Sequence, residues 1–524
     1  MDSEQAMREP FDIVLAGGRV IDPETGTDDV MDVALRGTRI ERVVPVSAEE
    51  LPSKRRVDCT GLVVCPGFID THAHSSGHRP SARIQVMDGV TMHLELEFGH
   101  HPVEAWYDRV AREGGAVIHY GASAGHIMAR IAAFECDENA AVPDEPPDKR
   151  ARREELRRSR GLDAQGLVNC NPHLLLGCAC CGAPSHQIVA TRDDVQQILA
   201  NIEASLDQGG LGIGMGIAYT EKADHEEVYR VFEMAARRKC VVFVHNRGEM
   251  RQLSDMHEVF ADAAATGASL VVCHIASSTG NNVNLPLTLE MIDRLNERNA
   301  ADITCEQYPY TAGMTRLESG VFNDGWRERL GIDYSDVEWI GTGERLKDEA
   351  DFLSKRAATG LVCIHSIPDA SVDLCMQHPR CLIASDAIPF DEEGRGHPRS
   401  AGCFSRVLRV YVRERKLISL MEAIRKMTLG PAKKLEPICS AFKAKARIQE
   451  GCDADICVFD PDHITDNATF QSAATPSSGI VHVLVNGHFV VQNGAFVECA
   501  VGYGEPIRAD TKHCFSNAAQ AEVL

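Results

Sequence analysis

Short, largely apolar runs recur along the chain, and three of them end in a residue that can bind a metal ion. These runs are Cys240–Val244 before His245, Leu270–Cys273 before His274, and Cys381–Ser385 before Asp386. Such runs are typical of strands buried on both faces of a parallel sheet. Helical patterns lie between them, as in Asp224–Ala235. The alternation predicts βα units, and a (β/α)₈ barrel places its catalytic groups at the carboxyl ends of its strands.

An earlier stretch carries two histidines, two residues apart. Gly67–His74 follows the apolar run Leu62–Cys65 and contains His72 and His74. Residues i and i+2 of a strand point to the same face, so both imidazoles can reach one metal ion. Taken alone, the pair is as readily a surface accident, because zinc usually takes four ligands. The later histidines and the aspartate can supply the remaining ligands.

A further run offers carboxylates. Val90–Glu97 alternates, so that His93, Glu95 and Glu97 share one face. An inward carboxylate beside a metal can bridge two ions or complete the coordination of one. The alternative is an ordinary solvated strand face.

Taken together, these residues resemble the amidohydrolase superfamily, and more closely its D-aminoacylase (N-acyl-D-amino-acid deacylase) branch. Further matching segments are Gly209–Tyr219, Glu306–Gly313, His397–Arg399, Phe404–Leu408 and Met427–Ala432. The resemblance covers most of residues 11 to 495. It implies an α/β fold, namely a TIM-like (β/α)₈ barrel with a small discontinuous β-sandwich domain. It also implies one or two Zn²⁺ ions bound by His72, His74, Glu97, His245, His274 and Asp386.

Two departures from the branch pattern bear on the site. The branch has a cysteine as metal ligand after its Gly-Val-Thr turn, whereas Glu95 and Glu97 occupy that region here. Glu97 is favoured because it lies nearer the strand end, and Glu95 is the alternative ligand. In the branch, the second single histidine is often followed by His-Lys, but here Ile275 follows His274. A lysine expected to grip the substrate carboxylate is therefore missing.

The resemblance implies a metal-dependent hydrolase that cleaves the linear amide C–N bond of an N-acyl-D-amino acid. A zinc-activated hydroxide would attack, with Asp386 as general base and then general acid. Tyr308, Arg399 and Arg247 are candidates for binding this small-molecule substrate. Core packing for the tyrosine and structural ion pairs for the arginines are the alternatives.

Three rival functions keep part of this pattern. A cyclic-amide hydrolase, like dihydroorotase or hydantoinase, would retain the metals but often uses a carboxylated lysine bridge, and no lysine stands at a matching strand end. A non-catalytic amidohydrolase-like scaffold would have lost ligands. A serine hydrolase would use Ser123, which lies in a Gly-x-Ser-x-Gly match.

The chain divides into four predicted parts. Residues 1–65 and 436–505 carry short strands and Gly-rich turns, and the resemblance implies that they form one composite β-sandwich domain. Residues 66–435 are predicted to form the barrel, with 136–190 as a loop insertion that contains a Cys-x-x-Cys patch. Residues 506–524 are expected to be a flexible tail.

Composition narrows the class of protein. The 524 residues carry a formal net charge of −22, which argues against a nucleic-acid partner. No apolar stretch reaches the length of a membrane span, and the N-terminus lacks the apolar region of a signal peptide. We therefore expect a cytoplasmic enzyme that has no membrane partner and whose cysteines are mostly reduced. The enzyme can form a homo-oligomer.

Overall fold

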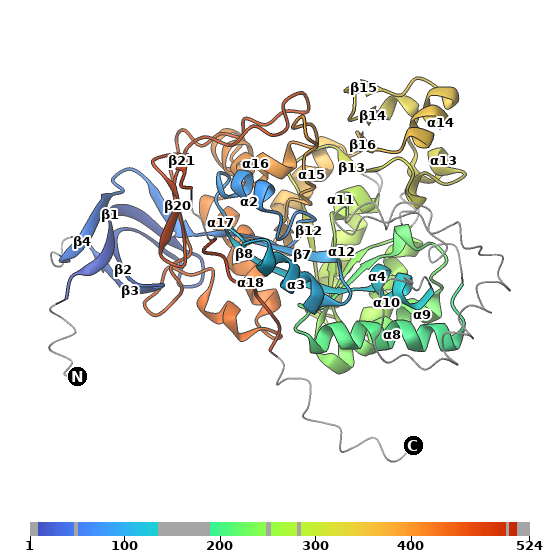
Figure 1. The fold of residues 1–524 in the computed structure, drawn as a ribbon, viewed down its shortest axis with the longest axis horizontal. Coiled ribbons are helices and arrows are strands. Elements are labelled where there is room, and N and C mark those ends of the chain that lie inside the picture. The colour runs from blue at the N-terminus through green and yellow to red at the C-terminus, as the bar shows by residue number, and fades with distance from the viewer. Residues whose placement is uncertain are drawn as a thin grey trace, which may run out of the picture.

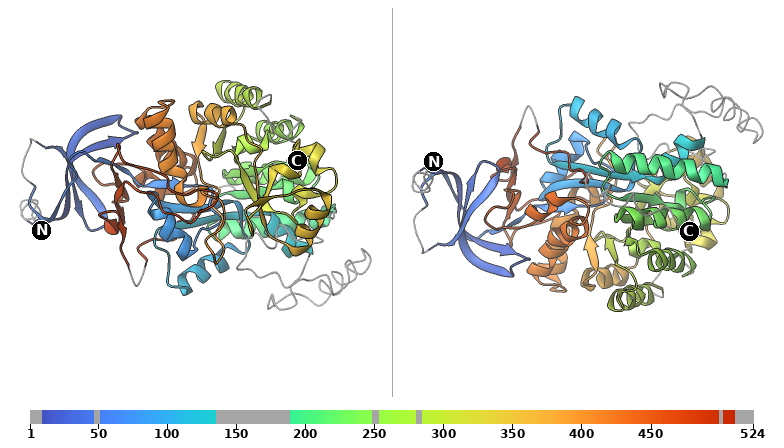
Figure 2. Two further views of the ribbon diagram at one scale, coloured as in Figure 1. Left: turned by 90° about the horizontal axis from the view of Figure 1, so that it is seen from above. Right: turned by 90° about the horizontal axis from the view of Figure 1, so that it is seen from below.

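The computed structural model describes residues 9–46, 51–134, 189–247, 253–279, 284–498 and 502–510. Its strands form three sheets of eight, nine and four strands. In Figure 1 the eight-stranded sheet and its helices extend from the middle of the molecule to its lower right, where α8, α9 and α10 lie. Figure 2 shows the nine-stranded and four-stranded sheets toward opposite ends.

The central sheet is a parallel barrel. In chain order its strands are β6 (Phe68–Asp70), β7 (Val90–His100), β8 (His119–Gly125), β9 (Ile213–Gly216), β10 (Val241–His245), β11 (Ser269–Val272), β12 (Ile303–Gln307) and β17 (Cys381–Ile383). Neighbours pair in that order. The first and last strands lie close together. The backbone N–H of Ser385, just after β17, donates to Oδ1 of Asp70, at the end of β6, at 3.0 Å. The predicted barrel fold is confirmed.

Helices follow the strands around the barrel. They include α2 (Arg79–Val86), α3 (Val103–Arg112), α4 (His126–Phe134), α8 (Arg192–Asp207), α9 (His225–Arg238), α10 (Ser254–Thr266), α12 (Asn284–Glu297), α15 (Asp369–Gln377), α16 (Arg399–Arg406), α17 (Leu420–Met427) and α18 (Leu429–Leu435). Helix α9 shows how capping and apolar residues at helical spacing specify such a helix. Asp224 caps its first turn by accepting from the N–H of Glu227, and Val228, Val231 and Phe232 are buried.

Both ends of the chain meet in the nine-stranded sheet. It contains β1 (Phe11–Asp22), β2 (Thr27–Arg36), β3 (Arg39–Pro45), β4 (Ser53–Asp58), β5 (Val63–Pro66), β18 (Ile456–Phe459), β19 (Ile480–Val485), β20 (His488–Gln492) and β21 (Ala495–Phe496). The fold class with a discontinuous β-sandwich is thus confirmed. The residue boundaries between the parts stay a prediction.

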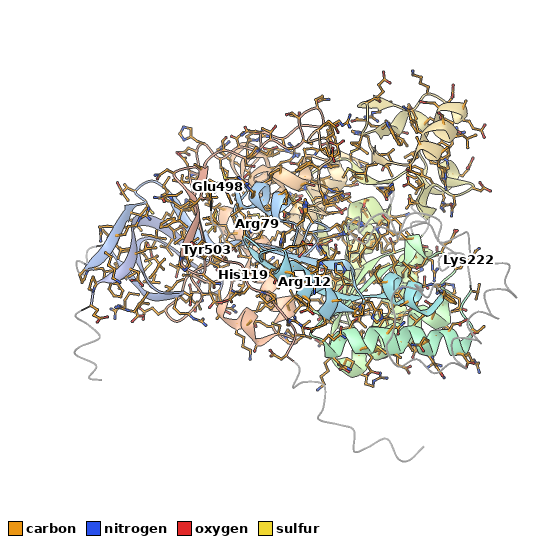
Figure 3. All side chains as sticks on the ribbon, in the orientation of Figure 1. Arg79, Arg112, His119, Lys222, Glu498 and Tyr503 are labelled. Carbon is orange, nitrogen blue, oxygen red and sulfur yellow. The ribbon has the colours of Figure 1, made fainter. Side chains whose placement is uncertain are left out.

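A buried polar cluster joins this sheet region to the barrel. His119, labelled in Figure 3, lies on β8, and its Nε2 is 3.0 Å from Oδ1 of Asp455. Lys445 also contacts Asp455, at 2.7 Å. All three side chains are buried, so the ion pair of Lys445 with Asp455 forms without competition from water.

The apolar run that precedes the histidine pair lies in a different sheet from the pair. The run Leu62–Cys65 does not lead into the histidine pair as a barrel strand, because Val63 and Val64 pair with β1 in the nine-stranded sheet. The barrel strand is the short β6, and the chain crosses from one sheet to the other at Gly67. Nothing can replace this glycine without moving Thr91, whose side chain would lie 2.2 Å from an added Cβ.

The four-stranded sheet was not predicted from the sequence. It consists of β13 (Gly313–Arg316), β14 (Val337–Trp339), β15 (Glu344–Arg345) and β16 (Leu361–Ile364), with α13 (Trp326–Leu330) and α14 (Glu349–Ala358) beside it. We call residues 313–364 the cap module. It has an apolar core of its own, which includes Phe322, Trp326 and Phe352. The chain enters it just after β12, at the carboxyl end of the barrel.

Two further points concern the predicted parts. The Cys-x-x-Cys patch and nearly all of the 136–190 insertion lie outside the described residues. Among the described residues, no helix is both long and apolar enough to cross a membrane.

Candidate metal centre and substrate cavity

The carboxyl end of the barrel collects six candidate ligands. His72 and His74 follow β6, Glu97 lies on β7, His245 ends β10, and His274 and Asp386 follow β11 and β17. All are buried except His245, whose side chain is 17% exposed. His274 and Asp386 have φ of 33° and 53°, and such left-handed backbone in non-glycine residues is often found at functional sites.

Four donor atoms form one compact set, which we call the first donor group. It consists of His72 Nε2, His74 Nε2, Glu97 Oε2 and Asp386 Oδ1. The two imidazole nitrogens are 3.2 Å apart, and Glu97 Oε2 is 3.1 and 3.3 Å from them. Asp386 Oδ1 is 3.5 and 3.3 Å from the same two nitrogens. Ligands about 2.0–2.1 Å from a tetrahedral zinc ion are about 3.3–3.4 Å apart, so this spacing fits zinc.

The other oxygen of Glu97 belongs to a second donor group. Glu97 Oε1 lies 2.9 Å from His245 Nδ1 and 3.0 Å from His274 Nε2. Three protein donors and an open side are the arrangement in which a catalytic zinc ion keeps a position for water or substrate. Glu97 therefore stands between two places that each suit a divalent ion.

The two glutamates of β7 take different positions. Glu97 faces all four histidines, whereas Glu95 contacts His74 Nδ1 at 3.0 Å, on the side of the ring away from the first donor group. Glu306 takes the equivalent place beside His72 Nδ1. Ser277 Oγ contacts His274 Nδ1 at 2.9 Å. Outer partners of this kind hold the ring orientation of metal-binding histidines.

The charges of the site favour a bound cation. Burial opposes ionisation of Glu97, but the imidazoles of His72 and His245 outweigh it and hold the pKa of Glu97 well below its usual value. Burial also opposes ionisation of Asp386, yet Arg399 and His72 lower its pKa. Both carboxylates are thus charged at neutral pH although they are buried. Buried charged carboxylates normally bind a metal ion or pair with a cationic side chain.

A cavity of about 310 Å³ opens above these donors, and we call it the first cavity. His74, Glu97, His245, His274 and Asp386 line it together with residues of the cap module. Tyr308 also lines it, and burial raises the pKa of its hydroxyl to about 12, so this group stays a donor at neutral pH. The cap module thus covers the donor groups and forms part of the cavity wall.

The two arginines predicted to bind substrate occupy different surroundings. Arg247 lines the first cavity, but its guanidinium makes two hydrogen bonds to Glu258, at 2.7 and 2.8 Å. Arg399 is fully buried and lies over the ring of Tyr308, at 4.5 Å from its centroid. Its Nη2 is 2.8 Å from Asp386 Oδ2, although the three guanidinium nitrogens have no aligned hydrogen bond among the described residues.

The serine-hydrolase alternative does not fit this geometry. Ser123 is fully buried on β8, and its hydroxyl donates to the carbonyl of Leu96 at 2.8 Å. It therefore faces a neighbouring strand instead of a substrate cavity, and a nucleophile needs an exposed oxygen with a base beside it.

Glu306 and Arg329 are among the site residues that sequence reasoning missed. Glu306 lies in a segment recognised for its tyrosines, and its signal was a carboxylate inside the buried strand β12. Arg329 lines the first cavity from just before the end of α13, and its guanidinium donates to the carbonyls of Val321 and Asp324 at 3.0 and 3.1 Å. No sequence signal pointed to it, because the cap module itself was not predicted.

Known proteins resemble this chain along most of its length. The model of the Amidohydrolase family matches residues 363–491. N-acyl-D-glutamate deacylase of Alcaligenes xylosoxydans xylosoxydans is 28% identical and covers 92% of this chain and 94% of its own length. D-aminoacylase of the same organism is 27% identical, covering 94% of this chain and 97% of its own length.

A solved structure shows the same fold. It is the crystal structure of N-acyl-D-glutamate deacylase from Bordetella bronchiseptica, complexed with zinc and a phosphonate inhibitor. The TM-score is 0.75 at 24% identity, over 96% of this chain and all of the other. The predicted resemblance to the amidohydrolase superfamily and its D-aminoacylase-like branch is confirmed.

Proposed function

We propose that this protein of the amidohydrolase superfamily is a zinc-dependent deacylase, which hydrolyses the linear amide C–N bond of an N-acyl-D-amino acid. The observation that carries the proposal is the position of Glu97, whose two oxygens each complete a set of metal donors under a cavity. The relatives named above, an N-acyl-D-glutamate deacylase and a D-aminoacylase, support the substrate class.

One or two zinc ions would be held by the two donor groups. When bound, zinc supplies Lewis-acid chemistry, because it polarises a carbonyl and lowers the pKa of water from 15.7 to about 7. The outer partners Glu306, Glu95 and Ser277 keep the histidine rings turned toward the donor groups. The buried barrel end keeps bulk water from competing for these positions.

Asp386 is proposed as the residue that moves the proton. It lines the first cavity, and Arg399 beside Oδ2 keeps it ionised, so it can accept a proton from the attacking water. Its lowered pKa then makes transfer of that proton to the departing nitrogen favourable. Protonation matters because a tetrahedral intermediate expels a neutral amine far more readily than an amide anion. Arg399 is thereby proposed to position Asp386, in addition to its predicted contact with substrate.

Substrate recognition is proposed to rest on the cavity wall. Tyr308 is a protonated hydroxyl donor that can stabilise the developing oxyanion. Arg329 offers a positive charge that, among the described residues, hydrogen-bonds only to backbone carbonyls, which suits a carboxylate of the substrate. It can stand in for the lysine that the chain lacks after His274. Arg247 is already paired with Glu258, so its contribution to substrate binding is expected to be smaller.

The rival functions are less well supported. A cyclic-amide hydrolase with a lysine bridge would need that lysine beside the histidines, and none is among the described residues that line the first cavity. A scaffold protein would not need six residues whose donor atoms are grouped at the spacing that metal ions require. A cytoplasmic location, the lack of a nucleic-acid partner and a homo-oligomeric state stay predictions from the sequence.

The test is release of primary amine from N-acetyl-D-glutamate, N-acetyl-D-leucine and their L-enantiomers. Zinc-loaded protein is compared with an Asp386→Asn variant carrying the same amount of metal. We expect release from D substrates alone and its loss in the variant. If none of the four substrates is cleaved by protein with verified zinc, the deacylase proposal is wrong and cyclic amides become the better candidates.

A further inference from the structure

A second cavity of about 490 Å³ adjoins the metal centre on another side. It shares two lining residues with the first cavity, His74 and Ile388. Both cavities therefore start at the first donor group and lead away from it. None of the roles proposed above uses the second one.

The cap module separates the two cavities. Its strands β13 and β16 pair with Gly313 opposite Ile364 and with Arg316 opposite Leu361. The first of these pairs lines the first cavity, and the second pair lines the second cavity. The cavities thus lie at opposite ends of the same two strands, with one wall module between them.

The two cavities differ in chemistry. The second cavity has an apolar wall of Trp339, Ile340, Leu361, Ile388, Pro389 and Phe390. Its charged residues are neutralised by neighbours: Arg316 pairs with Glu318, Arg109 with Glu113 and Asp391 with Arg395. Each of these arginines and carboxylates is already paired. A charged group of a ligand would therefore find no unpaired partner among them.

The first cavity, by contrast, offers polar groups to a ligand. The side-chain amide of Asn246 is buried there and has no hydrogen-bond partner among the described residues. Tyr308 and Arg329 add a hydroxyl donor and a positive charge. Polar parts of a substrate therefore belong in the first cavity, because buried polar groups without partners cost free energy until a ligand satisfies them.

The tryptophan of the second cavity is held in place by its neighbours. A Cβ added at Gly360 or Gly341 would lie 2.5 Å from atoms of the Trp339 ring, so the indole rests directly against glycine backbone. The ammonium group of Lys355 lies over the same ring, at 5.4 Å from the centroid. The apolar wall is thus a built surface, held by contacts on both sides of the indole.

We propose that the second cavity is the acyl subsite, and that it takes an aliphatic or aryl acyl chain longer than acetyl. This inference rests on the proposed deacylase function. The two substituents of an amide carbonyl diverge from its carbon, as the two cavities diverge from His74 and Ile388. The amino-acid part then occupies the polar first cavity, and the hydrocarbon chain occupies the apolar second cavity.

The main test is a chain-length series of N-acetyl-, N-hexanoyl- and N-decanoyl-D-glutamate. A buried methylene contributes about 0.8 kcal/mol, or about fourfold in kcat/KM, so hexanoyl should exceed acetyl by at least tenfold. A kcat/KM that stays flat or falls with chain length, while the acetyl substrate is cleaved, overturns the subsite and leaves the deacylase function standing.

A filling variant locates the effect. Leu361→Trp narrows the second cavity and should lower kcat/KM for the decanoyl substrate by at least tenfold, with the acetyl substrate changed less than about threefold. Leu353→Trp is the matched control, because Leu353 is an exposed leucine on α14 of the same module. Equal losses for both substrates in Leu361→Trp would contradict the proposal.

Two further measurements do not depend on that variant, and the second of them does not depend on turnover either. Phe390→Ala enlarges the second cavity and should move the preferred chain to a greater length. Binding of octanoate and acetate, measured by calorimetry, should favour octanoate at least tenfold in the wild-type protein. Equal affinities would sink the acyl subsite, even if no amide is hydrolysed and the proposed function has already failed.

Discussion

The two donor groups share Glu97 but differ in how completely the protein surrounds them. The first group has four donors, from His72, His74, Glu97 and Asp386, and five of their mutual distances lie between 3.1 and 3.5 Å. The second group has three, from Glu97, His245 and His274. A tetrahedral ion in the first group would have all its positions filled by protein, whereas one in the second would keep a position free.

This difference separates two kinds of metal position within one cluster. The more exposed second group includes His245, the most exposed of the six candidates. A free position facing a cavity is what a catalytic ion needs, and a filled one is what a supporting ion needs. We therefore expect the second donor group to dominate turnover and the first to tune it.

The largest effect is expected from Glu97→Gln, because it breaks both groups at once. The amide keeps the size of the side chain but removes the charge that faces four histidines. Metal content should fall to nearly none, and kcat/KM should fall by about 10³-fold or more, since the metal contributes several kcal/mol. Elemental analysis and amine release measure the two quantities. Circular dichroism checks the fold, and full metal content in the variant would refute the shared-ligand assignment.

A sharper comparison removes one ligand from each group. His245→Asn affects only the second group, and His74→Asn affects only the first. Each should lower the zinc stoichiometry of the fully loaded protein, and we expect a loss of about 10²-fold or more in kcat for His245→Asn against a clearly smaller loss for His74→Asn. Metal per protein and kcat are measured on the same preparations. A greater loss of kcat in His74→Asn would reverse the roles assigned to the two groups.

Much of this centre was predictable, for reasons that the residues themselves show. His245, His274 and Asp386 follow apolar runs, because buried parallel strands are continuous in hydrophobicity and end at the functional edge of a barrel. Glu97 was favoured over Glu95 from its place near the strand end, and it is the one that faces all four histidines. That Glu97 binds metal in both donor groups stays a proposal for experiment.

Other features were hidden for physical reasons. β6 has only three residues, so no apolar run marks it in the sequence, and the nearest such run, Leu62–Cys65, lies in the nine-stranded sheet. The cap module has short strands and a small separate core. Its apolar residues follow neither the helical nor the strand spacing over a long stretch of sequence. Arg329 and the second cavity depend on that module, so no local pattern could indicate them. Glu306 acts through His72, and a sequence does not show contacts between distant strands.

Smaller effects are expected from Glu306→Gln, which tests whether outer partners act on one group alone. Glu306 contacts the Nδ1 atom of His72, a ligand of the first group only, and loss of such a partner typically weakens metal binding by 10- to 100-fold. Titration with a zinc-sensitive chelator should show one weakened site and one unchanged site. Ser277→Ala is the counterpart on His274, and its effect should be smaller because Ser278 also lies 3.2 Å from the same nitrogen. If Glu306→Gln weakened both sites equally, the two donor groups would have to act as a single cluster, and the distinction between a filled and an open metal position would lose its basis.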